Sequence, residues 1–191
     1  LQVYVGRENI HHRLLEYLGG DSTKPLLLSG GSGTGKSSIL AKLHQGWRED
    51  HPDDFLLPHF VGASPSSTDI RLTLRRICLA LREGFNLTET PKGEAGQADG
   101  ASKPVPREVP EELERLKSAF QEFLKAVPEG KRAVLIIDAV NQFSELGASH
   151  EMAWLPDSLP PWVKVVVSCI EEPGKEQVAL SALRKRSTPE L

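Results

Sequence analysis

Four short apolar runs alternate with longer amphipathic stretches along the chain. The runs occupy residues 25–28, 55–62, 133–137 and 163–168. Three of them are continuously apolar or nearly so, which is typical of strands buried on both faces of a parallel sheet. Pro58 interrupts the run at 55–62. This strand is therefore predicted at the edge of the sheet, where a missing backbone N–H is tolerated.

Amphipathic helical patterns fill the intervals between the runs. Helices are predicted over residues 9–18, 36–47, 69–83 and 111–127. The third has apolar side chains every three or four residues, and Thr68 or Asp69 stands where its N-cap is expected. Strands that alternate with helices indicate βαβ units. The predicted fold is a three-layer α/β domain with a mainly parallel sheet.

Residues 88–110 break this pattern, because they contain four prolines and three glycines but few apolar side chains. Only Val105 and Val109 are sizeable and apolar, so the segment is predicted to be a flexible insertion, either a plain linker or a regulated one. The length of 191 residues suits one domain spanning residues 1–191. We expect this sequence to be a fragment of a longer chain, and we expect the fragment to end after its fourth core strand.

The composition limits the kinds of partner and the cellular compartment that we expect for this protein. The net charge of −3 gives no overall attraction to nucleic acid or to anionic membranes, so neither is expected as a partner. No apolar stretch approaches the roughly 20 residues of a membrane span, and no signal peptide is evident. Cys78 and Cys169 both lie in apolar stretches, which predicts buried thiols in a reducing compartment. A cytoplasmic location is therefore expected.

The stretch "GGSGTGKSS" at residues 30–38 follows the first apolar run and opens a predicted helix. It fits G-x-x-x-x-G-K-[ST], in which glycines let backbone N–H groups converge on a polyphosphate. Lys36 is predicted to hold the β- and γ-phosphates, and Ser37 to give its hydroxyl to Mg²⁺. The predicted nucleotide-binding residues here are Gly30, Gly31, Ser32, Gly33, Thr34, Gly35, Lys36, Ser37 and Ser38.

A second acidic element follows the run at residues 133–137. Asp138 stands where that strand emerges, at the carboxyl edge of a parallel sheet, and is predicted to organise Mg²⁺ together with Ser37. No carboxylate adjoins it. Asn141 is the candidate for orienting an attacking water, although an amide cannot accept its proton, and the next carboxylate is Glu145. Lys36, Asp138 and Asn141 are thus the candidate catalytic residues.

Other side chains are weaker candidates. The six histidines lack metal-ligand spacing and are predicted to be solvated or to cap helices. His59, at the end of a predicted strand, is a candidate for facing the site. The serines of "ASPSST", Ser64, Ser66 and Ser67, are candidates for contacting water or magnesium. The guanine-reading N-K-x-D box is missing, which argues against a GTPase.

Three segments carry a resemblance to a known family. "YVGRE" at residues 4–8, placed before the glycine loop, resembles the opening motif of signal-transduction ATPases with numerous domains, the AAA-like branch that includes NACHT proteins. "PHFVGASPSSTDIRLTLRRIC" and "WLPDSLPPWVKVVVSCIEE" resemble the nephrocystin-type subgroup, which joins this module to tetratricopeptide or WD repeats. The resemblance implies an ATP/ADP-dependent switch that arranges oligomers or partners bound to repeats outside this chain. It also implies that Gly6 and Arg7 lie near the nucleotide and that Ser168 senses the γ-phosphate.

Two departures from the family pattern concern hydrolysis. Typical NACHT members carry an acidic pair where this chain has Asn141 and Gln142, and many have T-S-R where it reads "SCI" from Ser168. The prediction is a MgATP-binding switch with slow or partner-dependent hydrolysis. A non-hydrolysing interaction module stabilised by nucleotide is the alternative, followed by a small-molecule kinase.

Overall fold

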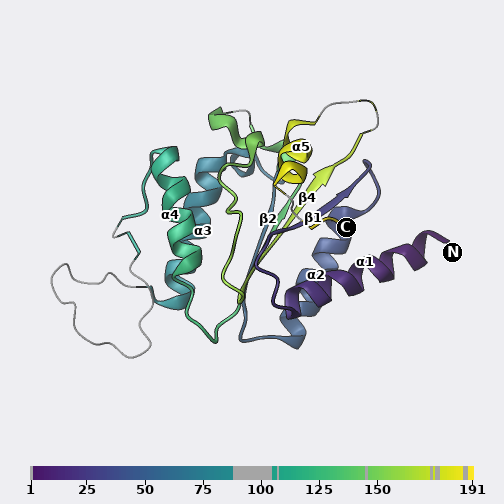
Figure 1. Ribbon diagram of the computed structural model, residues 1–191, viewed down its shortest axis with the longest axis horizontal. Coiled ribbons are helices and arrows are strands. Elements are labelled where there is room, and N and C mark those ends of the chain that lie inside the picture. Colours follow the sequence, from purple (N-terminus) through teal and green to yellow (C-terminus); the bar gives the residue numbers. More distant parts are fainter. Residues whose placement is uncertain are drawn as a thin grey trace.

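Helices cover both faces of a parallel sheet in the computed structural model, which places them in three layers (Figure 1). It describes residues 2–87, 105–106, 108–144, 146–172, 174, 177–186 and 189–191, with the backbone alone at 2–7 and 146–148. The helices are α1 (Gln2–Gly19), α2 (Lys36–Asp50), α3 (Ile70–Phe85), α4 (Leu113–Lys125) and α5 (Val178–Lys185). The strands are β1 (Leu26–Gly30), β2 (Phe55–Phe60), β3 (Ala133–Asp138) and β4 (Val163–Ile170). Short 3-10 segments are η1 (Pro65–Thr68), η2 (Val140–Gln142) and η3 (Leu146–Glu151).

The strand order is β1-β4-β3-β2, and every pair is parallel. The three-layer α/β prediction is confirmed. The strand that contains Pro58 lies at the sheet edge, as the missing N–H predicted. It is shorter than expected, because Gly62 turns the chain with a positive φ of 87°. β1 in turn extends to Gly30, so the first glycine of the loop still belongs to the sheet.

Side-chain alternation along the central strands builds one core on each face of the sheet. Leu135 and Val165 join the core beneath α3, α4 and α5, whereas Ile136 and Val166 join the core beneath α1 and α2. Because both faces are covered, β3 is buried along its whole length. This burial on both faces explains why β3 is a continuous apolar run in the sequence.

A local signal in the sequence fixes the start of α3. Asp69 caps α3, since its Oδ1 accepts hydrogen bonds from the backbone N–H groups of Arg71 at 2.8 Å and Leu72 at 3.4 Å. The alternative cap, Thr68, instead donates its hydroxyl to Pro65 O at 3.0 Å. The first helix begins at Gln2, seven residues before the predicted start at Asn9, because the apolar periodicity used for the prediction begins later than the helix.

The end of the predicted insertion belongs to the core. Val105 and Val109 are both buried, and Arg82 of α3 donates a hydrogen bond to Pro106 O at 2.6 Å. Most of residues 88–110 lies outside the described residues, so flexibility there stays a prediction.

The last residues extend the sheet beyond β1. Leu27 donates its N–H to Pro189 O at 2.8 Å, and the N–H of Leu191 returns to Leu27 O at 2.8 Å. A third bond joins Ser29 N–H to Leu191 O at 2.9 Å. These residues form one isolated parallel bridge, between Leu27 and Glu190, at the free edge of β1.

Polar groups are buried at the amino-terminal edge of the sheet. Lys164 of β4 is fully buried, and its Nζ donates to Ser22 O at 2.7 Å. Burial lowers its pKa to about 8, with a further contribution from Arg132 that Asp21 partly offsets. The Tyr17 hydroxyl donates to Lys24 O at 2.9 Å and accepts from Val165 N–H at 3.2 Å. These bonds attach α1 to the sheet.

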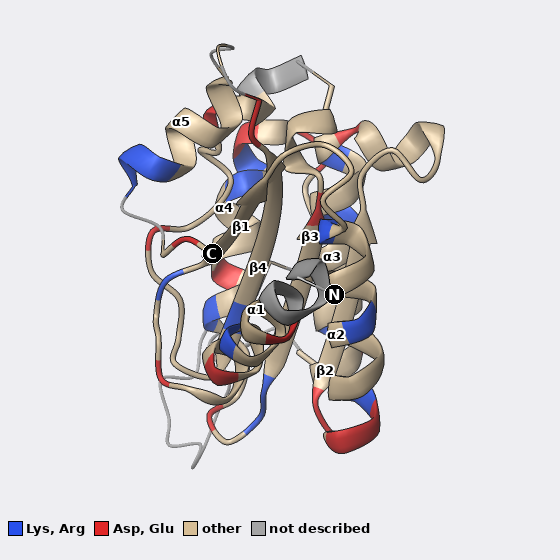
Figure 2. Cartoon of the chain, turned by 90° about the vertical axis from the view of Figure 1, so that its right-hand side faces the viewer, with Lys and Arg blue, Asp and Glu red and all other residues tan. Residues whose placement is uncertain are grey.

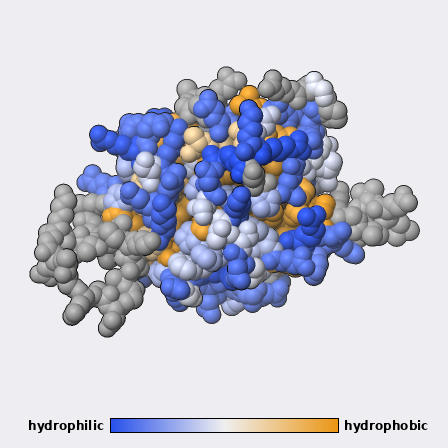
Figure 3. Space-filling view, in the orientation of Figure 1, coloured by the Kyte–Doolittle hydropathy of each residue, from blue (hydrophilic) through white to orange (hydrophobic). Residues whose placement is uncertain are grey.

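The surface mixes both signs of charge, as Figure 2 shows. The face seen in Figure 3 is mostly hydrophilic, with small apolar areas between charged residues. Cys78 and Cys169 are both buried free thiols, as predicted, and burial raises their pKa values to about 12 and about 11. None of the described helices combines the length and apolarity that crossing a bilayer requires.

The cap of α3 gives a prediction about stability. Replacing Asp69 with Ala leaves the first N–H groups of α3 without their side-chain acceptor, so we expect a loss of about 1 kcal/mol in the free energy of unfolding. Urea denaturation measures it. Asp53→Ala, at an exposed position, is the matched control and is expected to change little. Equal stability of the two variants would refute the capping role.

The buried lysine gives a prediction about pH. Because the pKa of Lys164 falls from 10.5 to about 8 on folding, the unfolded chain binds more protons between these values. The contribution of Lys164 to the free energy of unfolding therefore rises with pH from about 8 to 10.5. The difference between wild type and Lys164→Met should follow this rise in urea titrations, while exposed Lys131→Met should show none. Parallel pH profiles for wild type and Lys164→Met would show that the lysine titrates normally.

Candidate nucleotide site

The glycine loop lies between the end of β1 and the start of α2. Gly33 and Gly35 have φ angles of 72° and 87°, which favour glycine, and Gly30 has a φ of 151°. Gly35 is the N-cap of α2, and no side chain caps this helix end. The first N–H groups of α2 are therefore available to an anion, and the positive end of the helix dipole adds to the attraction. The loop suits a polyphosphate.

Lys36 folds back over this loop. Its Nζ donates to Gly30 O at 2.7 Å and to Gly31 O at 2.8 Å. Burial lowers the pKa of the Lys36 ammonium, while the nearby Asp138 carboxylate partly offsets that effect. The side chain thus carries its charge at the loop and close enough to Asp138 to interact electrostatically with it.

Asp138 is held by a serine on the neighbouring strand. The carboxylate is buried, and its Oδ1 accepts a hydrogen bond from the Ser168 hydroxyl. Ser168 Oγ in turn accepts the N–H of Ala139 at 2.8 Å. Ala139 has a φ of 57°, an uncommon conformation for a residue with a side chain. Ser168 thus fixes both the carboxylate and the turn that follows it.

The same strand joins the carboxylate to the glycine loop. In the sheet register, Gly30 stands opposite Ile170 on one side of β4, and Ile137 stands opposite Val167 on the other. Just past the strand, Glu171 N–H donates to Gly30 O at 2.9 Å. Lys36, Asp138 and Ser168 consequently meet at one edge of the sheet.

The amide pair after Asp138 lies against neighbouring backbone. Asn141 Oδ1 accepts the N–H of Ile170 at 3.2 Å, which attaches η2 to the end of β4. Gln142 lies over the turn at Gly62, where an added Cβ would collide with its side-chain oxygen. The third candidate in this region, Glu145, lies outside the described residues.

His59 turns away from the glycine loop and towards α3. Its Nε2 lies 3.0 Å from both Ser67 O and Thr73 Oγ1, and its Nδ1 lies 3.2 Å from an Arg76 nitrogen. Burial is the main reason that its pKa is lowered. The expectation that it faces the site is wrong, because the partner helix decides which way a strand-end side chain points.

The serines near β2 are also structural. Ser67 Oγ accepts the N–H groups of Gly62 at 2.9 Å and Ser64 at 3.1 Å and donates to Ser64 O at 2.6 Å. Its hydrogen bonds close the turn between β2 and α3. Ser64 and Ser66 are exposed there and lie 3.2 Å apart at their hydroxyls.

Gly6 and Arg7 belong to the first turns of α1, where the structure describes the backbone alone. Their predicted nearness to the nucleotide stays a prediction. In the loop itself, Ser32, Gly33, Thr34, Ser37 and Ser38 are exposed. Thr34 Oγ1 donates to Gly31 O at 2.9 Å, a bond that shapes the loop from within.

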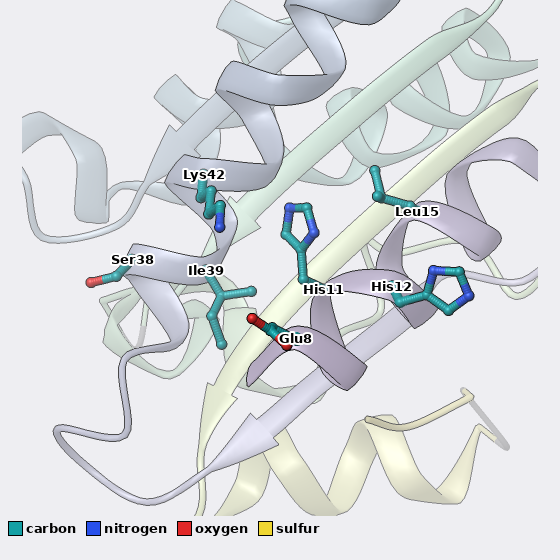
Figure 4. A pocket seen from close by; sticks show the side chains of 7 residues that line it. All are labelled: Glu8, His11, His12, Leu15, Ser38, Ile39 and Lys42. Atoms are coloured by element: carbon teal, nitrogen blue, oxygen red, sulfur yellow. The ribbon is translucent and has the colours of Figure 1, made fainter. Parts of the chain in front are cut away.

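A cavity that the sequence did not predict lies beside the glycine loop. It has a volume of about 240 Å³ and lies between α1 and α2 (Figure 4). Its lining residues are Glu8, His11, His12, Leu15, Ser38, Ile39 and Lys42. His11 was expected to be solvated or to cap a helix, but its Nε2 is buried here without a hydrogen-bond partner among the described residues. No local signal marks this cavity, because it depends on how the two helices pack against each other.

The donor set fits magnesium bound through a nucleotide. Within the described residues, no three His, Cys, Asp or Glu side chains gather closely enough to hold a metal ion alone. Ser37 and Asp138 supply oxygen ligands of the type that Mg²⁺ takes, and such sites are usually completed by phosphate and water. With the uncapped start of α2, these residues suit a magnesium–polyphosphate pair.

Known proteins share both the sequence pattern and the fold. Nephrocystin-3 of Mus musculus is 34% identical over 145 residues, covering 75% of this chain and 10% of that protein. The NACHT and WD repeat domain-containing protein 2 of Mus musculus is 24% identical over 169 residues, covering 85% of this chain and 9% of that protein. A TPR repeat-containing protein of Dictyostelium discoideum is 27% identical over 233 residues, covering 98% and 14%. The chain thus spans about a tenth of the length of these relatives.

A solved structure of Drosophila ORC bound to DNA matches with a TM-score of 0.51 and 14% identity, covering 100% of this chain and 90% of that one. At this identity the match shows the fold alone. The family described as "AAA ATPase domain" matches residues 3–167. The predicted resemblance to NACHT and AAA-like P-loop NTPases of the nephrocystin type is therefore confirmed. By the extent of the family match, the chain belongs to the AAA ATPase domain family.

Proposed function

We propose that this domain binds MgATP and acts as a nucleotide-dependent switch with slow or partner-dependent hydrolysis. The observation that carries the proposal is the meeting of Lys36, Asp138 and the uncapped start of α2 at one edge of the sheet. A glycine loop alone would bind anions without selecting among them. A buried carboxylate next to it favours a phosphate that brings a divalent cation.

Each residue has one task in this proposal. The backbone of residues 30–35 cradles the phosphates, and Lys36 exchanges its two carbonyl contacts for β- and γ-phosphate oxygens. Ser37 and Asp138 ligate Mg²⁺. Ser168 keeps the Asp138 carboxylate turned to the site, and its place between β3 and β1 suits a residue that responds to the γ-phosphate. The magnesium ion supplies charge neutralisation at the phosphates when bound.

Hydrolysis is proposed to be slow because the site lacks a positioned base. Asn141 stands where a carboxylate would act, and its Oδ1 is already bonded to Ile170 N–H. An amide held in this way orients a water at most through its NH₂ group, and it takes no proton. A partner that supplies a carboxylate or reshapes η2 would raise turnover.

The alternative is an interaction module in which bound nucleotide only stabilises the fold. The engagement of Asn141 favours it, since its Oδ1 accepts the backbone N–H of Ile170 instead of facing substrate. Relatives whose names include TPR or WD repeats support protein partners bound through repeats outside this chain. Under either alternative we propose that the domain is cytoplasmic, and under the switch we also propose that nucleotide state governs assembly.

Replacing Lys36 with Ala tests the binding site. We expect MgATP affinity to fall at least about tenfold, because the variant loses a charge-assisted contact to phosphate. Titration calorimetry with MgATP and MgADP measures it, and a single-turnover assay on the same samples measures hydrolysis. Lys125→Ala, exposed at the end of α4, is the matched control. Unchanged affinity in a variant that unfolds at the wild-type temperature would sink the assignment of the loop.

Replacing Asn141 with Asp tests the missing base. The carboxylate is able to keep the bond to Ile170 N–H while its second oxygen accepts a proton from water. We expect the single-turnover rate to rise by about tenfold or more, within the range of general-base catalysis. Asn141→Ala serves as the control for loss of the backbone contact. If the Asp variant gains nothing, geometry and not the lack of a base limits turnover.

A further inference from the structure

The turn between β2 and α3 presents a serine directly before a proline. Ser64 is exposed, and its backbone is extended, with a φ of −149° and a ψ of 160°, as the residue before a proline favours. Pro65 then opens η1. Ser66 is exposed too but precedes no proline, and Ser67 is buried with its hydroxyl closing the turn. Ser64 is thus the accessible hydroxyl with proline as its next residue.

A cavity of about 400 Å³ lies beside this serine, between the turn and α3, and its lining includes Ser64, Ser66, His59 and Arg76. The Nη2 of Arg76 donates to Pro58 O at 3.0 Å and lies 3.2 Å from His59 Nδ1. Its Nε and Nη1 make no hydrogen bond to any residue that the structure describes. Arg76 therefore keeps donors for a further acceptor in the cavity.

Arg76 is also a cation without an anionic partner. Burial lowers the pKa of its guanidinium, and no carboxylate pairs with it in the described part of the chain. Arg71, by contrast, pairs with Asp69 at 3.2 Å. A guanidinium that is partly removed from water is stabilised by an anion, and its planar fork suits a phosphate. The cavity thus combines an accessible hydroxyl with a cation that is able to hold a phosphate.

We propose that Ser64 is the acceptor of a proline-directed protein kinase and that Arg76 binds the phosphate it receives. The Ser64 Oγ attacks the γ-phosphorus of the MgATP that the kinase carries. The Oγ–P bond forms as the bond from phosphorus to the β-phosphate oxygen breaks, the hydroxyl proton passes to the base of the kinase, and ADP leaves. Phosphoserine then brings about two negative charges and three acceptor oxygens to the cavity.

Two other residues of the chain precede prolines in the same way. Thr90 and Thr188 stand before Pro91 and Pro189, but both threonines lie outside the described residues. The combination of exposure, extended backbone and a neighbouring unpaired arginine therefore supports Ser64 alone.

The turn that carries Ser64 is bonded to the segment that carries Asp138. Val61 N–H donates to Asp138 O at 3.2 Å, and Ser144 N–H donates to Thr68 O at 2.9 Å. A phosphate on this turn adds negative charge at the edge of the sheet where the glycine loop also lies. Like charges repel, so phosphorylation is expected to weaken the binding of MgATP. This consequence rests on the proposed function, whereas the modification itself does not.

Incubation of the folded domain with MgATP and a purified mitogen-activated protein kinase, followed by peptide mass spectrometry, tests the acceptor. We expect phosphate on residues 62–69 of wild type and of the matched control Ser66→Ala, and none on that segment of Ser64→Ala. A synthetic peptide of residues 58–71 reports whether the kinase accepts the sequence when it is unfolded. Phosphate on the peptide but not on the folded domain overturns the site, as does modification of neither.

Thermal unfolding of domains with phosphoserine inserted at position 64 tests the role of Arg76. At pH 8 the phosphate carries its full charge and His59, whose pKa is lowered, is neutral. Phosphorylation should shift the melting temperature of wild type upwards, relative to its effect on Arg76→Gln, by about 2–4 °C. Arg75→Gln, at an exposed position lining a different cavity, is the matched control and should behave as wild type. An equal shift in wild type and Arg76→Gln overturns phosphate binding by Arg76.

Calorimetry with MgATP on the same samples tests the consequence. We expect the phosphorylated domain to bind several-fold more weakly at low ionic strength, and salt to reduce the difference because it screens the added charge. Equal affinities would overturn the effect on nucleotide binding and leave the modification site in place. An unmodified domain that binds no MgATP would overturn the proposed function, while the mass spectrometry and the melting temperatures would still decide the roles of Ser64 and Arg76.

Discussion

The insertion of β4 between β1 and β3 is the constraint on which the site depends. The glycine loop follows β1 and the Asp138 carboxylate follows β3, two strands that do not touch. Their spacing is set by β4, which pairs with both along its length. Ser168 uses this position to bond the carboxylate, and Glu171, just past the strand, bonds the carbonyl of Gly30. Backbone ladders therefore fix the distance between the cationic and acidic halves of the site, which is more rigid than any arrangement of surface side chains.

Much of this architecture could be predicted because strands covered on both faces leave a continuous apolar run. The glycine loop could be predicted equally well, because binding a polyphosphate requires glycine, lysine and serine at fixed intervals. What could not be predicted depends on contacts between distant segments. His59 faces α3 because Ser67 and Thr73 are there to bond it, and nothing in its own strand specifies that direction. The cavity at His11 depends likewise on how α1 packs against α2, and helix periodicity does not fix that geometry.

The two amide residues after Asp138 stand where the sequence predicts a catalytic role, whereas the structure shows them against backbone. Sequence comparison with the acidic pair of typical NACHT members predicts a weakened catalytic centre at Asn141 and Gln142. In the structure Asn141 also connects η2 to β4 through a hydrogen bond to backbone, while Gln142 lies against the turn at Gly62 after β2. Ala139, held at a positive φ between them and Asp138, shows that this segment is tightly determined. The segment after Asp138 is thus fixed to the sheet by the N–H of Ala139 and by the side chain of Asn141.

Contacts also lead from the loop to the last residues of the chain. Arg184 of α5 bonds Glu171 at 2.9 Å and Glu190 at 2.9 Å, but these groups are substantially exposed, so water screens the pairs and each contributes little. The stronger links are the backbone bonds of Glu171 to Gly30 and of Leu27 and Ser29 to residues 189–191. A movement of the loop would therefore pass into β1 and β4 first. The ion pairs on α5 are too weak to oppose a movement of the strands, so they would rearrange after it.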